Sequence, residues 1–102
     1  MSAAPFVVTV VFRAKPEFRA QFRAAMLENA AASRTDEPGC RQFDVCESAD
    51  GSTIFLYEIY DDEAAFKAHL ATAHYQRFNA SVTPWTAEKH VVTYNLASPL
   101  AP

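Results

Sequence analysis

The chain has few of the residues on which common cofactor sites depend. Only 2 of its 102 residues are glycine, and no GxGxxG, phosphate-binding loop or GxSxG motif occurs. This excludes the usual glycine-rich nucleotide and flavin sites. The two cysteines, Cys40 and Cys46, lie in one expected strand about 20 Å apart, which is too far for a disulfide bond. Without a CxxC motif, a zinc site is not expected either, so we predict no cofactor and no metal.

Net positive charge and long apolar runs are also missing. The formal net charge is −3 and there is no basic run, which argues against nucleic acid and anionic membrane surfaces as partners. No stretch approaches the roughly 20 apolar residues that cross a bilayer. The first residues lack the basic start of a signal peptide, so we expect a cytoplasmic protein. The length predicts one domain, residues 1–102, with a core at about 6–96 and a tail at 97–102.

The apolar residues are plentiful and periodic. Half of the chain is hydrophobic and 13% is aromatic, which is enough for a packed core. Alternation and turn signals predict strands at 6–13, 41–48, 53–60 and 90–96. Helical spacing predicts a helix at about 17–34, a second from about 61, and a short piece at about 74–80. The order β-α-β-β-α-β predicts a ferredoxin-like α+β fold with a four-stranded antiparallel sheet.

Two of the expected strands are apolar on both faces. Residues 6–13 and 53–60 carry large apolar side chains at odd and at even positions. A sheet with one face in water alternates more cleanly. Since the helices cover one face, we predict that a second copy of the chain covers the other, which gives a homodimer.

His69 is the first candidate for chemistry. It lies between Phe66 and Leu70 on the apolar face of its expected helix. A histidine there can move protons near neutral pH, although a core histidine bound to a backbone carbonyl has the same pattern. Asn29 lies on the apolar face of the first helix. Its amide could hold a carbonyl or oxyanion, or bond to a neighbouring loop.

The third expected strand offers a carboxyl and a phenol on one face. Glu58 could be a base with a raised pKa, or the partner of an arginine across the dimer. Tyr60 could line a pocket or simply fill the core. His74 begins the last helical piece. There it could cap the helix, be exposed, or reach the mouth of a pocket.

The segments NAAAS (29–33), EPGC (37–40), QFDV (42–45) and YEIYDDEAAFKAHLATAHY (57–75) resemble the antibiotic biosynthesis monooxygenase (ABM) family. The resemblance covers about residues 6–96 and implies a dimeric α+β barrel with a pocket between sheet and helices. Many members are cofactor-free oxygenases that act on quinols or polyketide phenols. The resemblance places Asn29, Phe43, Glu58, Tyr60, His69 and His74 in the pocket.

The main hypothesis is a cofactor-independent monooxygenase of a quinol or other hydroxyaromatic compound, with oxygen as co-substrate. His69, Asn29 and Glu58 would carry the chemistry. The expected substrate contacts are Phe43, Tyr60, His74, Phe66 and Phe22.

Two alternatives remain open. The chain is also similar to the phosphorylated autoinducer-2 isomerases of this family. It departs from them at Ala30, where that branch carries a histidine, and in one extra residue between Ser33 and Glu37. Arg13, Arg34 and Arg41 are the candidate cations for a sugar phosphate. The other alternative is a dimeric binding module without chemistry of its own.

Overall fold

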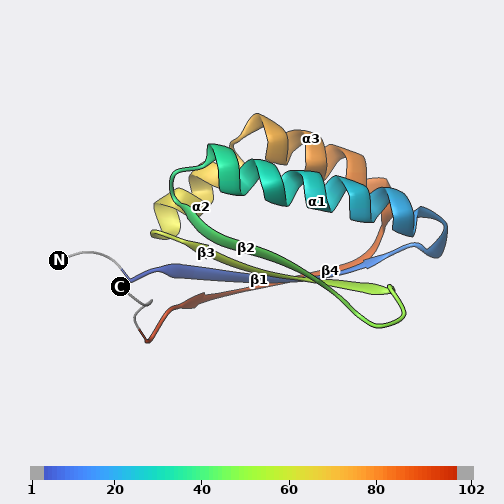
Figure 1. Ribbon diagram of the computed structural model, residues 1–102, viewed down its shortest axis with the longest axis horizontal. Coiled ribbons are helices and arrows are strands. Elements are labelled where there is room, and N and C mark those ends of the chain that lie inside the picture. The colour runs from blue at the N-terminus through green and yellow to red at the C-terminus, as the bar shows by residue number, and fades with distance from the viewer. Residues whose placement is uncertain (1–3, 99–102) are drawn as a thin grey trace.

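A computed structural model describes residues 4–98 and has the predicted element order (Figure 1). The elements are β1 (Phe6–Ala14), η1 (Pro16–Phe18), α1 (Arg19–Asp36), β2 (Cys40–Glu47), β3 (Thr53–Tyr60), α2 (Glu63–Leu70), α3 (Ala73–Val82), η2 (Thr83–Trp85) and β4 (Thr86–Asn95). The ferredoxin-like α+β fold expected from the sequence is therefore confirmed. The predicted tail is described only to residue 98, and its last part lies outside the described residues.

The four strands form one antiparallel sheet in the order β2-β3-β1-β4. In the centre, Val8 pairs with Glu58 of β3 on one side and with Thr93 of β4 on the other. Paired residues in a sheet point to the same face, so these three side chains point toward the helices together with Val10 and Phe12. Figure 1 shows all helices on that face and none on the other.

The core lies between α1, α3 and the sheet. The buried stripe of α1 is Phe22, Met26, Asn29, Ala30 and Ser33, at the spacing of one helix face. Phe12 of β1 meets Phe22 with ring centroids 5.2 Å apart and an interplanar angle of 63°, an edge-to-face contact. Two of the five buried stripe residues are polar, and both lie in the half of α1 nearer its end.

A side-chain cap begins each of the helices α2 and α3. The carboxylate of Asp62 accepts a hydrogen bond of 2.8 Å from the Ala65 amide and begins α2. The hydroxyl of Thr72 accepts one of 3.2 Å from the Tyr75 amide and begins α3. The Thr72 cap lies at the break between the two helices, and His69 and His74 lie on either side of it.

Some predicted boundaries were wrong. The helix predicted at 17–34 begins with the 3₁₀ turn η1, and α1 itself runs on to Asp36. Strand β4 begins at Thr86, four residues before the predicted start, because pairing with β1 extends it through a register shift at Ala14. The turn between β2 and β3 contains Gly51, whose φ of 74° is a conformation that favours glycine.

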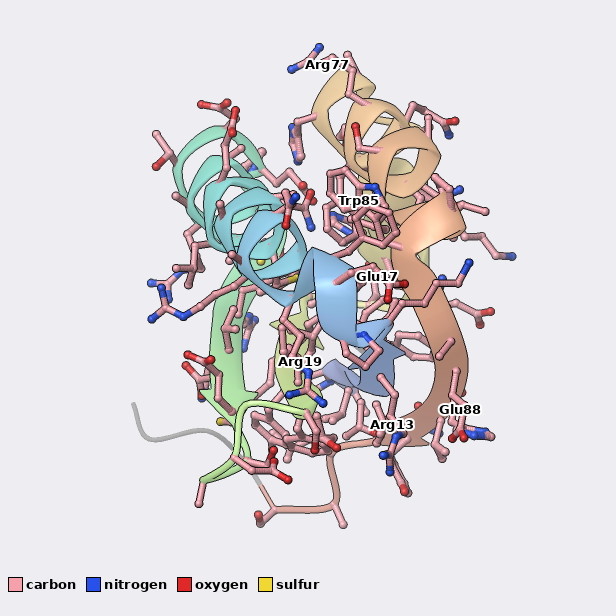
Figure 2. The ribbon with its side chains drawn as sticks, turned by 90° about the vertical axis from the view of Figure 1, so that its right-hand side faces the viewer. Arg13, Glu17, Arg19, Arg77, Trp85 and Glu88 are labelled. Atoms are coloured by element: carbon pink, nitrogen blue, oxygen red, sulfur yellow. The ribbon has the colours of Figure 1, made fainter. Side chains whose placement is uncertain are left out.

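At the far end of the helix layer, Trp85 stacks on Phe18 with ring centroids 5.9 Å apart. Figure 2 shows Trp85 between the first turn of α1 and the end of α3.

Cys40 is buried, Cys46 is exposed, and both are free, as the predicted strand geometry required. Within residues 4–98, no helix is both long enough and apolar enough to cross a membrane.

Candidate functional site

A cavity of about 300 Å³ lies between the helices and the sheet. Its wall is mostly apolar and comes from β1, β2, β3, β4 and all three α-helices. Five predicted site residues line it: Asn29, Phe43, Glu58, Phe66 and His69. The volume is near the lower end of the range of about 300–1,000 Å³ that is usual for small-molecule sites.

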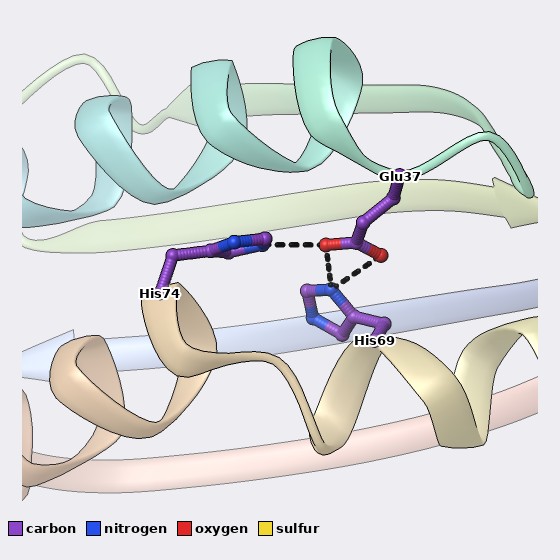
Figure 3. Close-up of side chains that lie close together, drawn as sticks. All are labelled: Glu37, His69 and His74. Atoms are coloured by element: carbon purple, nitrogen blue, oxygen red, sulfur yellow. Dashed lines mark hydrogen bonds and ion pairs between the residues drawn. The ribbon is translucent and has the colours of Figure 1, made fainter.

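His69 is in the last turn of α2 and is 3% exposed. Its Nδ1 is 2.8 Å from Oε2 of Glu37, as Figure 3 shows. A carboxylate can only accept, so this contact assigns the proton to Nδ1 and leaves a lone pair on Nε2. Burial lowers the pKa of His69, and the hydrogen bond to Glu37 acts in the opposite direction.

Aromatic rings fix the orientation of this imidazole. The rings of Phe43, Tyr60 and Tyr75 have centroids 6.0, 5.4 and 5.0 Å from that of His69. In Figure 3 the second ring nitrogen points away from Glu37. His69 therefore presents an unprotonated nitrogen within an apolar wall, which is the arrangement of a base oriented by a carboxylate.

Glu37, which caps the end of α1, connects the two histidines. Its side chain is 9% exposed, and Oε2 is also 2.5 Å from Nε2 of His74. Glu37 was not among the predicted site residues, because Glu-Pro-Gly at residues 37–39 is typical of a helix end. The sequence did contain a signal for Glu37. An acidic residue is unfavourable beside the negative C-terminal end of a helix unless it has partners, so its position there indicates that such partners exist.

Ser33 was also missed. Its hydroxyl donates to the backbone oxygen of Asn29 at 2.9 Å, and its Oγ lies 3.5 Å from Nδ1 of His69 and 3.4 Å from Nε2 of His74. It is fully buried. Its place one turn after Asn29 on the buried stripe was the sequence signal for a polar group at this site.

Among the described residues, the ligand atoms of Glu37, His69 and His74 form a group within 4.8 Å of one another that could hold a metal ion.

Glu58 is a second group that can exchange a proton with the cavity. It is 3% exposed, and the Tyr60 hydroxyl donates to its Oε1 at 2.6 Å. Burial raises the pKa of Glu58 to about 7, although the Tyr60 hydrogen bond opposes the shift. Burial and the neighbouring Glu58 raise the pKa of Tyr60 above its ordinary value, so this phenol stays protonated.

Three predicted substrate contacts lie outside the cavity wall. Tyr60 is fully buried beneath it and holds Glu58. Phe22 is a core residue against Phe12 and Phe78. His74 lines a separate groove of about 290 Å³ between α1 and α3, and the cap expected of it is supplied by Thr72. Substrate contact by these three stays a prediction.

The cavity also has lining residues that were not predicted. Tyr75 comes from α3, and Lys89 and Val91 come from β4. The Nζ of Lys89 lies 5.5 Å from the centroid of the Phe12 ring. Residues 89 and 91 were missed for different reasons. Lys89 fell before the predicted start of the fourth strand, and Val91 was expected in a strand whose faces were not assigned.

Asn29 has an unfulfilled hydrogen-bonding group. It is 4% exposed, and within residues 4–98 its Oδ1 is buried without a partner. Buried polar oxygens usually have a donor, because leaving one unpaired costs about 1–3 kcal/mol. The side chain lines the inner cavity, so a hydroxyl of a bound molecule could supply that donor.

Comparisons with known proteins show the family of the chain. Residues 5–81 match the family model described as "Antibiotic biosynthesis monooxygenase". The chain is 35% identical over 78 residues to "Putative monooxygenase Rv0793" of Mycobacterium tuberculosis, which is 76% of each chain. It is 36% identical over 75 residues to "Putative monooxygenase YcnE" of Bacillus subtilis, covering 72% of this chain and 78% of that one.

A solved structure has the same fold over almost the whole length. The "Putative antibiotic biosynthesis monooxygenase from Nitrosomonas europaea" superposes with a TM-score of 0.89 at 31% identity, covering 99% of this chain and 98% of that one. The family match spans both β1 and the helices that carry His69 and His74. The chain therefore belongs to the antibiotic biosynthesis monooxygenase family.

Proposed function

We propose that the protein is a cofactor-independent monooxygenase that oxidises a quinol or another hydroxyaromatic compound in the cavity between sheet and helices. Family membership and the names of its relatives support oxygenation. The observation that carries the proposal is the Glu37–His69 pair, because the imidazole held by Glu37 belongs to a residue that lines an apolar cavity together with Glu58.

In this reaction Nε2 of His69 removes the phenolic proton. Glu37 stabilises the imidazolium that forms and keeps its ring in place. The resulting anion is electron-rich enough to react with dioxygen, and the apolar wall excludes competing water. One oxygen atom enters the substrate and the other leaves as water. The substrate supplies all four electrons, as when a quinol becomes a hydroxyquinone.

Asn29 and Glu58 would bind the substrate oxygens. The free Oδ1 of Asn29 can accept a hydrogen bond from one hydroxyl, and the amide N–H₂ can stabilise the oxyanion. Glu58, with a pKa of about 7, can take or return a second proton. A compound with two hydroxyls on one ring would offer one hydroxyl to each of these side chains.

Oxygen uptake by metal-free protein across a panel of quinols and anthrone-like phenols tests this proposal. We expect saturable uptake that falls about 10²–10⁴-fold in His69→Ala, the usual contribution of a general base. Glu37→Gln should lower kcat, while Glu63→Gln, a matched change at an exposed glutamate, should leave it unchanged. Uptake that is unchanged in His69→Ala would refute the role of the imidazole.

Two further assays distinguish the alternatives. None of the predicted phosphate-binding arginines lines the cavity, and Arg41 is paired with Asp61 at 2.6 Å. Lys89 is the cation that reaches it. An isomerase would convert a phosphorylated ketose under nitrogen, and a binding module would bind a phenol without consuming oxygen. Either result would replace the oxygenase proposal.

We further propose that the protein is a homodimer that packs through the outer face of its sheet. Large apolar side chains lie exposed there, since Phe55, Val92 and Tyr94 are 37%, 46% and 53% exposed. No helix covers this face in Figure 1, and a patch of this kind usually marks an interface. Light scattering should give twice the mass of one chain, and the double substitution Val92→Glu and Tyr94→Glu should halve it. A monomeric wild type at micromolar concentration would refute the dimer.

A further inference from the structure

Four donor atoms converge at the ends of three helices. Glu37 Oε2 lies 2.8 Å from Nδ1 of His69 and 2.5 Å from Nε2 of His74. The Oγ of Ser33 lies 3.4–3.5 Å from the same two nitrogens. Figure 3 shows the two rings meeting the carboxylate from α2 and α3. The donors thus surround one small volume.

The charge at this point is poorly compensated by the protein. The side chain of Glu37 is 9% exposed, and among residues 4–98 it forms no ion pair with lysine or arginine. Its charged or potentially charged partners are the two imidazoles. A buried carboxylate is costly without a cation, so a positive ion would be favourable here.

The donor set is the kind that first-row transition ions prefer. Two imidazole nitrogens and one carboxylate oxygen bind Zn²⁺ at about 2.0–2.2 Å, whereas Mg²⁺ and Ca²⁺ prefer oxygen ligands. The three ligand atoms already lie within 4.8 Å of one another. Their contacts of 2.5 and 2.8 Å would lengthen when an ion enters between them. Because the Ser33 proton is directed to the Asn29 carbonyl, a lone pair of Oγ remains for the ion or its water.

An ion can reach this point without entering the inner cavity. His74 is 14% exposed and lines the groove between α1 and α3, together with Asn29 and Glu28. The groove wall carries one acidic and one basic side chain, Glu28 and Arg77, so their charges offset each other and the ligands themselves must attract the ion. The ligands come from the end of α1, the last turn of α2 and the first turn of α3, so the site is held by rigid elements.

We propose that Glu37, His69 and His74 bind one divalent first-row transition ion, such as Zn²⁺, with Ser33 beside it. The site shares His69 and Glu37 with the proposed oxygenase function. An ion on Nδ1 would place the imidazole proton on Nε2 and turn His69 from an acceptor into a donor toward the cavity. The metal site itself does not depend on that function, because binding is measured without substrate.

Calorimetric titration of the metal-free protein with Zn²⁺, and the visible absorption of bound Co²⁺, test the site. We expect one ion per chain, ligand-field bands from nitrogen and oxygen ligands, and no competition by Mg²⁺. His74→Asn and Glu37→Gln should each weaken binding more than about 10-fold, since even residues behind the ligands contribute 10–100-fold. His90→Asn is the control, because His90 is exposed beside Glu88 and away from the cluster.

Circular dichroism of each variant would show that the fold is kept. The proposal is overturned if neither ion binds, or if Zn²⁺ binds equally well to the wild type, His74→Asn and Glu37→Gln. It is also overturned if His90→Asn is the variant that loses binding. Stoichiometric binding that is lost in the cluster variants and kept in His90→Asn would establish the site.

Discussion

Glu58 should make the protein less stable as the pH rises from about 4.5 to about 7. Its side chain is 3% exposed, and burial raises its pKa from 4.5 to about 7. A carboxyl with a raised pKa in the folded state costs nothing below the unfolded pKa, where it is protonated in both states. The cost grows between pH 4.5 and about 7 and is constant above that. A shift of this size corresponds to about 3 kcal/mol.

Glu58→Gln removes the ionisable group and keeps an oxygen to accept the Tyr60 hydroxyl. We therefore expect the variant to match the wild type near pH 4.5 and to gain up to about 3 kcal/mol of unfolding free energy by pH 8. Urea unfolding at fixed protein concentration, from pH 4.5 to 8.5, measures this difference. Other titrating groups cancel in the comparison.

Glu63→Gln is the matched control, because its side chain is 62% exposed and should show no such trend. A constant difference between wild type and Glu58→Gln at every pH would refute the reasoning. It would mean that Glu58 is ionised in the folded protein as readily as in the unfolded chain.

Three further predictions concern the scaffold. A Cβ at Gly39 would lie 2.7 Å from Cβ of Ala65, so Gly39→Ala should cost about 1–3 kcal/mol in urea unfolding, and Ala65→Gly should restore most of it; equal costs in both backgrounds would disprove the clash. Asp62→Ala should lose the α2 cap and about 1 kcal/mol, whereas Asp62→Asn should keep most of it. Phe22→Ala should cost about 3–5 kcal/mol, because the ring is 0% exposed in the core, and a loss below 1 kcal/mol would contradict that placement.

The fold could be predicted because its signals are local. The third strand was predicted with both ends correct, since the Asp-Gly turn precedes it and Asp62 begins a helix after it. The start of β4 could not be predicted in this way. Residues 86–89 have no apolar alternation of their own, and their pairing with β1 extends the strand.

The site was only partly predictable for the same reason. His69 and Asn29 could be found because a polar residue on an apolar helix face is visible locally. Glu37 is 32 residues from His69 and 37 from His74, and no period in the sequence connects them. Only the packing of α1 against α2 and α3 places these side chains together.

Alternate side chains of strand β4 face two different environments. A substitution therefore changes one environment, whereas a change in strand length affects both. Lys89 and Val91 face the cavity, while Val92 and Tyr94 face the opposite side of the sheet. Substitutions at odd positions can therefore alter the cavity wall over evolution without changing the outer face of the sheet, and those at even positions can do the reverse. Loss or gain of one residue within the strand would exchange the two sets together. We expect relatives to diverge here by substitution and to keep the spacing between η2 and the strand end.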